Sequence, residues 1–127
     1  MNRCALFAAT VLVAAAPALA QVHRHFPADA LRGDFKVVLA PEVLLNGKPA
    51  RLSPGHRIWA ANGFQVLYGE ITGQAFPAVH YTQHPDGELK EVWILNAIER
   101  QNRLWPKTRA EASQWQFNLA SQTWSKP

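Results

Sequence analysis

Gln21, Val22 and His23 form the first arrangement in the sequence with a definite chemistry. If export cleaves the chain after Ala20, they become a new N-terminus whose free amine is followed by a histidine at position three. An amine, two backbone amides and an imidazole bind Cu(II) in a square plane, which is the tetragonal nitrogen geometry that copper prefers. His25 adds a further ligand. Cyclisation of Gln21 removes the amine, and a histidine near a terminus is more often only solvated, so a periplasmic copper-binding protein is the alternative interpretation.

A second group of residues lies near the C-terminus, where tryptophans and basic residues interleave. Residues 100–127 contain five basic residues and one acidic residue, Glu111, and so hold more than the whole excess positive charge. This mixture is typical of proteins that contact a membrane surface, where indoles lie at the lipid interface and cations bind anionic head groups. The same residue types also stack on the faces of sugars or nucleobases. Tryptophans that pack into a core produce the same pattern, which is the competing interpretation. The residues expected to form a binding surface are Arg103, Trp105, Lys107, Arg109, Trp115, Phe117 and Trp124.

The chain shows no catalytic motif. Ser53, His56 and Asp34 are the one set near turns that contains a nucleophile, a base and an acid, and no nucleophile-elbow sequence surrounds Ser53. His80 and His84 would stand about 13 Å apart in an extended strand, too far to share a metal ion, and are expected to be half-exposed. No Gly-rich loop precedes a helix, as a nucleotide site requires. We therefore expect a protein that is not an enzyme, with no cofactor apart from Cu(II) under the alternative interpretation.

Residues 1–20 have the three parts of a secretory signal peptide. Arg3 supplies the positive start, residues 5–16 form an apolar stretch, and Ala18-Leu19-Ala20 is a small-residue cleavage site. The single cysteine, Cys4, leaves with this segment, so the mature chain is expected to have no disulfide and no zinc–thiolate site. An exported chain without disulfides fits a bacterial periplasmic or secreted protein better than a eukaryotic extracellular module. No apolar run reaches the length of a transmembrane helix.

The length and charge of the remaining chain limit the function further. Without residues 1–20, the 127-residue chain keeps 107 residues, which is enough for one small domain. The chain has 13 Lys and Arg residues and nine Asp and Glu residues, so loss of Arg3 leaves a net charge of +3. This modest charge and the expected export both disfavour a nucleic acid as partner.

The elements that must position these residues are expected to be β-strands. Asn46-Gly47 predicts a type I′ hairpin, because both central residues of that turn need positive φ. Ser53-Pro54-Gly55 predicts a further reversal. Short extended runs bounded by Gly and Pro predict a small antiparallel sandwich or open barrel of six to seven strands, and the two architectures share this pattern. The expected strands cover residues 34–39, 42–45, 48–52, 56–60, 64–68, 77–82 and 89–95.

The C-terminal segment carries two signals that point to different structures. Thr108-Arg109-Ala110-Glu111 matches a capping box and predicts a short helix. Trp115, Phe117 and Leu119 alternate as in a strand. We therefore expect an irregular or short-helical tail. The expected organisation is a signal peptide at 1–20, a lead-in with few contacts at 21–32, a β-domain at 33–95 and a basic, Trp-rich tail at 96–127.

Three strings of the sequence resemble a group of known proteins. They are RHFPADALRG at 24–33, PEVLLNGKPARLSPGHRI at 41–58 and GELKEVWIL at 87–95. Over about residues 24–95 the chain resembles small exported proteins of Gram-negative proteobacteria for which no activity is assigned. The resemblance implies export and supplies no site residues.

Together these patterns predict an exported, non-enzymatic β-domain that binds a partner. The expected partner is an envelope component or another exported protein, with peripheral contact to a membrane surface through the aromatic and basic tail. Exposed strand edges, such as the hairpin arm that carries Pro49, are a second expected contact.

Overall fold

The computed structural model describes residues 24–127, which form eight strands and three short helices. The expected signal peptide and the residues Gln21, Val22 and His23 lie outside the described residues. The elements, in chain order, are β1 (Leu31–Leu39), β2 (Glu42–Leu45), β3 (Lys48–Trp59), β4 (Gln65–Val66), α1 (Tyr68–Ile71), β5 (Ala75–Gln83), β6 (Leu89–Ile94), α2 (Ala97–Gln101), α3 (Arg109–Gln114), β7 (Gln116–Asn118) and β8 (Thr123–Ser125).

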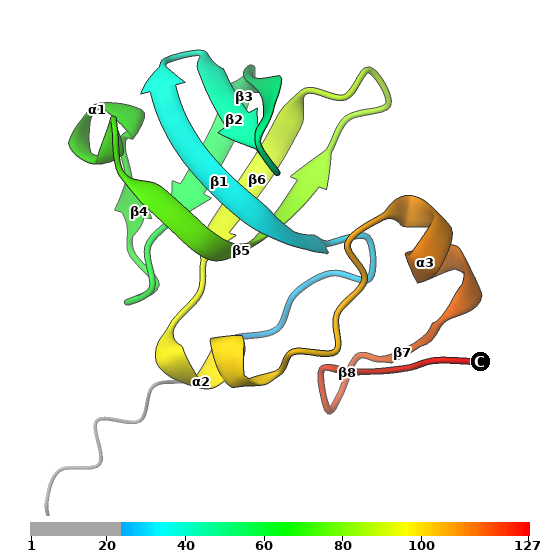
Figure 1. Ribbon diagram of the computed structural model, residues 1–127. Helices are drawn as coiled ribbons and strands as arrows, with labels where there is room; N and C mark the ends of the chain where they lie inside the picture. The colour runs from blue at the N-terminus through cyan, green and yellow to red at the C-terminus, as the bar shows by residue number, and fades with distance from the viewer. Residues whose placement is uncertain (1–23) are drawn as a thin grey trace, which may run out of the picture.

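Five of the strands close into a small barrel (Figure 1). The sheet order is β2-β1-β5-β6-β3-β4, and an additional pairing of β2 with β3 completes the closure. All neighbours are antiparallel except β3 and β6, which run parallel. The prediction of a small all-β fold is therefore confirmed, and of the two architectures left open the barrel is the one observed. Strands β7 and β8 form a separate hairpin.

The hairpin that joins β2 and β3 follows the predicted turn. Asn46 and Gly47 both have positive φ, 55° and 76°, as a type I′ turn requires. The reversal predicted at Ser53-Pro54-Gly55 is wrong, because β3 continues through these residues to Trp59. The pairing of β3 with β6 shifts between Leu52 and Arg57. Pro54 lies in this irregular stretch. Proline has no backbone N–H, and it is tolerated here because the stretch makes no ladder bonds with β6.

The strand predicted at 64–68 is also shorter than expected. Only Gln65 and Val66 pair with β3, and Tyr68 begins α1. Leu67 N–H donates to the Glu70 carboxylate, which caps this helix turn. Phe64 and Tyr68 are exposed, so their alternation with Val66 does not mark a buried strand face.

Two hydrophobic cores lie on opposite sides of the barrel wall. The first fills the barrel and includes Phe35, Ile58, Val79 and Val92. The second lies against the outer face of β5 and β6, where four consecutive residues of β5 are buried. Its buried members come from the lead-in, the end of β6 and the tail: Phe26, Ala30, Leu95, Trp105 and Trp124.

The lead-in makes more contacts than its sequence predicts. Strand β1 begins at Leu31, inside the segment predicted as lead-in, and Phe26 is fully buried. The side chain of Gln122 bonds to both backbone groups of Phe26, with its oxygen 2.8 Å from the amide nitrogen. The lead-in and the tail therefore run side by side along the barrel (Figure 1).

Gly33 of β1 lies directly against the side chains of Asn46 and Tyr81, which leave no room for a Cβ atom. A Cβ at this position would lie 2.6 Å from Asn46 Oδ1, which already accepts the Asp34 amide at 3.0 Å. Gly33→Ala is expected to lower the free energy of unfolding by about 1–3 kcal/mol, because the Asn46 side chain must move and give up its bond to the Asp34 amide. Urea unfolding measures the change. Gly55→Ala is the control, since its Cβ meets nothing within 4 Å, and an equal loss in both variants would contradict the explanation.

Tyr81 gives the barrel a pH dependence. Burial raises the pKa of Tyr81 above its ordinary value of 10.0, and an Asn46 hydrogen bond and the Arg109 charge oppose this effect. Above pH 10 the Tyr81 phenol loses its proton in the unfolded chain but keeps it in the folded chain. The contribution of this group to stability is therefore fully present below pH 10 and is lost as the pH rises through the pKa of the folded state. Relative to Tyr81→Phe, the native chain is expected to lose stability between pH 9 and 11 in urea unfolding. A pH-independent difference would contradict this.

Candidate functional site

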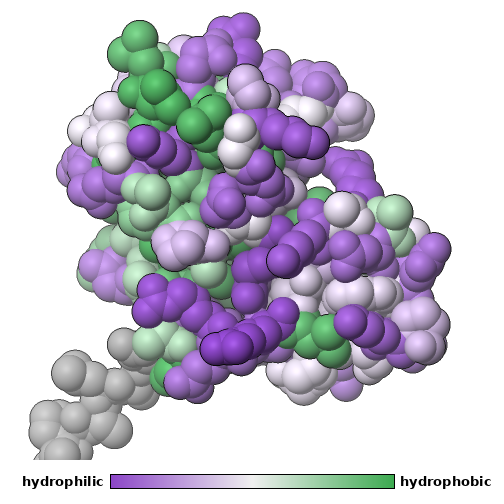
Figure 2. Space-filling view, viewed as in Figure 1, coloured by the Kyte–Doolittle hydropathy of each residue, from purple (hydrophilic) through white to green (hydrophobic). Residues whose placement is uncertain are grey.

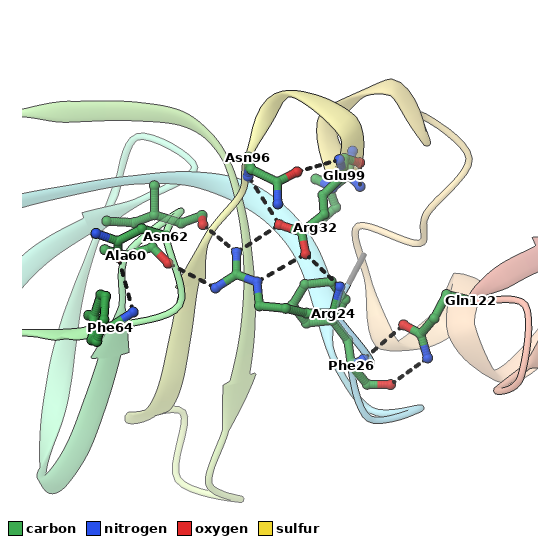
Figure 3. Close-up of polar contacts among 10 residues, drawn as sticks. Arg24, Phe26, Arg32, Ala60, Asn62, Phe64, Asn96, Glu99 and Gln122 are labelled. Atoms are coloured by element: carbon green, nitrogen blue, oxygen red, sulfur yellow. Dashed lines mark hydrogen bonds and ion pairs between the residues drawn. The ribbon is translucent and has the colours of Figure 1, made fainter. Parts of the chain in front are cut away.

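Arg24 joins four parts of the structure at one end of the barrel (Figure 3). Its guanidinium donates to the carbonyl of Ala60 in the β3–β4 turn at 2.9 Å and to that of Ile94 at the end of β6 at 2.7 Å. The same group forms an ion pair with Glu99 of α2, with Nη2 and Oε1 2.7 Å apart. Arg24 N–H donates to the other carboxylate oxygen of Glu99. The arginine therefore fixes the lead-in, the β3–β4 turn, β6 and α2 relative to one another.

Glu99 is a buried charge with a complete set of partners. Its side chain is 1% exposed, and both of its oxygens accept hydrogen bonds from Arg24. It also closes a capping box with Asn96, because each side chain bonds to the backbone N–H of the other. A buried carboxylate is tolerated when its lone pairs are satisfied in this way.

Arg32 is a second buried guanidinium in this region. Burial lowers the pKa of Arg32 to about 10, against the opposing charge of Glu99. Its Nη2 donates to the carbonyl of Asn102 at 2.8 Å, and its guanidinium lies 6.0 Å from the centre of the Trp105 ring. The two arginines thus hold α2 and the start of the tail from different sides.

A depression of about 280 Å³ opens beside Arg24 and carries two indoles. Trp59 and Trp93 are register partners in the parallel strands β3 and β6. Their neighbours Ile58 and Val92 are buried in the barrel, so the two indoles project from its outer face, where both are half-buried. We call this depression the aromatic pocket; it is lined by Arg24, His25, Trp59, Gly63 and Trp93.

The aromatic pocket offers stacking faces with polar groups at their edges. Side chains that neighbour each other across a sheet stand about 5 Å apart, so both indoles line the same depression. The Trp93 ring also lies in edge contact with Phe26, with the ring centres 5.6 Å apart. Trp59 Nε1 is buried and has no hydrogen-bond partner within residues 24–127. The exposed imidazole of His25 lies at the rim, and Phe64, 74% exposed, follows Gly63 in the β3–β4 turn. Flat ligands with hydroxyl groups fit such a surface chemically.

The tail residues predicted to form a binding surface have different environments. Trp105 and Trp124 are 2% and 5% exposed, so the prediction that they form an exposed surface is wrong. Trp105 stacks on His80 at 4.0 Å and donates its indole N–H to the Ala30 carbonyl. His80 is itself buried, which corrects its expected half-exposure. The physical reason is that Phe26, Ala30 and Leu95 form an apolar cluster on the outside of the barrel, and the two indoles complete it.

The remaining tail residues stay nearer to solvent. Phe117 is half-buried and stacks on Trp124 at 4.7 Å, and Trp115 is half-buried beneath Lys126. The basic side chains predicted in that surface, Arg103, Lys107 and Arg109, are exposed. Arg109 donates to the Gln83 carbonyl at 3.3 Å, so it also ties α3 to the barrel. The basic residues thus remain on the surface while two of the four aromatic residues are removed from it.

The copper hypothesis stays a prediction. Of its four residues only His25 is described, and it is exposed beside Arg24. Within residues 24–127 no group of three His, Cys, Asp or Glu side chains is placed to hold a metal ion.

The catalytic set considered in the sequence is not assembled as a triad would require. His56 Nδ1 lies 2.7 Å from the carbonyl oxygen of Ser53, so it donates to the backbone and not to the hydroxyl. Asp34 is exposed on β1, where its backbone bonds to Asn46.

Comparisons with known proteins assign the chain to no family. No family model matches the chain, and no curated protein or solved structure shows significant similarity to it. None of the helices in the described part of the chain is long and apolar enough to cross a membrane. The aromatic pocket, which sequence reasoning missed, has no local signal: Trp59 and Trp93 become neighbours only through the parallel pairing of β3 and β6.

Proposed function

We propose that the protein is an exported, non-enzymatic binding domain whose aromatic pocket holds a sugar ring of an envelope glycan. The observation that carries the proposal is the pair of half-buried indoles, Trp59 and Trp93, aligned on neighbouring strands in a depression. Indole faces stack on the apolar faces of sugar rings, and the indole N–H and imidazole at the edge match ring hydroxyls. The predicted signal peptide and bacterial export supply the compartment in which such glycans occur.

The rigidity of the pocket supports binding as its role. Arg24 is held by five hydrogen bonds to Glu99, Ala60 and Ile94, and these hold both strand ends and the β3–β4 turn. A pocket that is fixed before the ligand arrives loses little side-chain entropy on binding. The exposed basic residues of the tail, including Arg103 and Lys107, supply the small positive field expected of a protein that approaches an anionic envelope surface.

Titration with the N-acetylglucosamine trimer tests this proposal. We expect a saturable change in tryptophan fluorescence, and we expect Trp59→Ala to weaken binding about tenfold or more, because one stacked ring contributes about 1–3 kcal/mol. Retention on insoluble peptidoglycan is expected to fall in parallel.

Trp115→Ala is the matched control, because Trp115 is also half-buried but lies beneath Lys126 in the tail. It is expected to bind the trimer and peptidoglycan like the native chain. Equal losses in the two variants, or no binding of either glycan by the native chain, would overturn the proposal.

A further inference from the structure

A second depression lies beside Ser53 of β3, six residues before Trp59 of the aromatic pocket. It has a volume of about 260 Å³ and adjoins a shallower one with which it shares Ser53, Pro54 and Glu88. We call it the Ser53 cavity. The polar and aromatic residues that line it are Arg51, Ser53, His56, Tyr68 and Glu88.

The surface around the end of β1 is hydrophobic, whereas hydrophilic side chains cover most of the C-terminal segment (Figure 2).

The irregularity in β3 produces this cavity. Leu52 pairs with Leu89, and the next paired residue of β3 is Arg57, opposite Glu91. The four residues between them make no ladder with β6, so β3 bends away from its neighbour there. Ser53 lies in this gap.

Ser53 carries the observation that points to a ligand. The residue is 4% exposed, it lines both depressions, and its Oγ has no hydrogen-bond partner among residues 24–127. A buried hydroxyl without a partner is unfavourable and uncommon, and such a group requires an explanation. A ligand that bonds to the hydroxyl supplies one.

The groups around Ser53 have opposite charges. Glu88 is half-buried and has no ion pair within the described residues, and the ion pair that Arg51 forms there is with the exposed Glu42, at 3.5 Å. His56 donates from Nδ1 to the Ser53 carbonyl at 2.7 Å, which holds its ring beside the cavity. The Tyr68 ring lies 5.9 Å from that of His56.

We propose that the Ser53 cavity binds a small zwitterion of the amino-acid type. The ammonium group of the ligand donates to the Glu88 carboxylate and to Ser53 Oγ, against the face of Tyr68, which also attracts a cation. The carboxylate of the ligand pairs with the Arg51 guanidinium. The volume lies below the usual range of ligand pockets, so the ligand is small. This site is independent of the glycan proposed for the aromatic pocket.

Amide NMR titrations with glycine, acetate and methylammonium test the proposal. Glycine is expected to shift the amides around Ser53 and Glu88 and to bind at least about tenfold more tightly than either single ion, since both charges contribute. Failure of glycine to move these amides, or equal affinity for acetate or methylammonium, would overturn it.

Two variants separate binding from folding. Ser53→Ala removes a buried hydroxyl without a partner, so it is expected to raise the Tm while weakening glycine binding about tenfold. Glu88→Gln keeps the shape and is expected to weaken binding at least as much, whereas Glu91→Gln, also half-buried on the same barrel, is expected to bind normally. Normal glycine affinity in Ser53→Ala and Glu88→Gln would show that the cavity is not the site.

Discussion

Trp105→Ala is expected to lower the free energy of unfolding by about 3–5 kcal/mol, the range for loss of a fully buried aromatic ring. The ring is 2% exposed, stacks on His80 and lies in edge contact with Phe26 and Trp124. Its indole N–H also satisfies the carbonyl of Ala30 at 2.8 Å. The substitution therefore leaves both a cavity and an unpaired carbonyl in the second core. Urea unfolding followed by far-UV circular dichroism measures the loss.

Trp115→Ala supplies the comparison within the same segment. Trp115 is only half-buried at the edge of the second core, where the Lys126 ammonium lies 5.3 Å from the centre of its ring. A loss of about 1 kcal/mol or less is expected. If the two variants lose the same stability, the second core contributes less to folding than its burial indicates, and the interpretation of the tail as a surface segment is the better one.

Glu99→Gln is expected to destabilise the fold by about 3–5 kcal/mol. Removing one member of a buried ion pair leaves the other charge uncompensated, and this penalty exceeds the net value of the pair itself. The substitution preserves the shape but removes the charge opposite Arg24, which holds four parts of the chain together. Chemical unfolding of the variant measures the effect.

Glu70→Gln is the matched control for Glu99→Gln. Glu70 accepts a backbone N–H in a capping box at α1, but it is exposed, so a change of about 0.5 kcal/mol or less is expected. The double variant Arg24→Met with Glu99→Met is expected to regain part of the stability, because it buries no unpaired charge. A double variant as unstable as Glu99→Gln would mean that geometry, and not the unpaired charge, causes the loss.

Local features of the fold were predictable from sequence because they depend on single residues. Asn46-Gly47 specifies its turn through positive φ, and Thr108 caps α3 by accepting the Glu111 amide, as the capping box predicts. The alternating signal is confirmed in part: Phe117 lies in β7, whereas Trp115 caps the end of α3 and Leu119 is exposed beyond the strand. The two signals in the tail were therefore consecutive and not alternatives.

Features that depend on distant pairing could not be predicted. The parallel contact of β3 with β6 leaves no trace in either strand, so neither the barrel closure nor the meeting of Trp59 with Trp93 follows from local pattern. The burial of Trp105 depends in the same way on distant residues, because Phe26 and Ala30 of the lead-in and Leu95 after β6 pack around it. One local signal was missed: Asn96 and Glu99 have capping-box spacing, and it starts α2.

The indole N–H region of the amide NMR spectrum tests the central claim most directly, because each of the five tryptophans gives its own signal. On titration with the N-acetylglucosamine trimer, the signals of Trp59 and Trp93 are expected to shift together, while those of the buried Trp105 and Trp124 stay in place. Assignment by single substitution identifies each signal. Shifts confined to Trp115, or no shift of the Trp59 and Trp93 signals, would contradict a glycan site in the aromatic pocket.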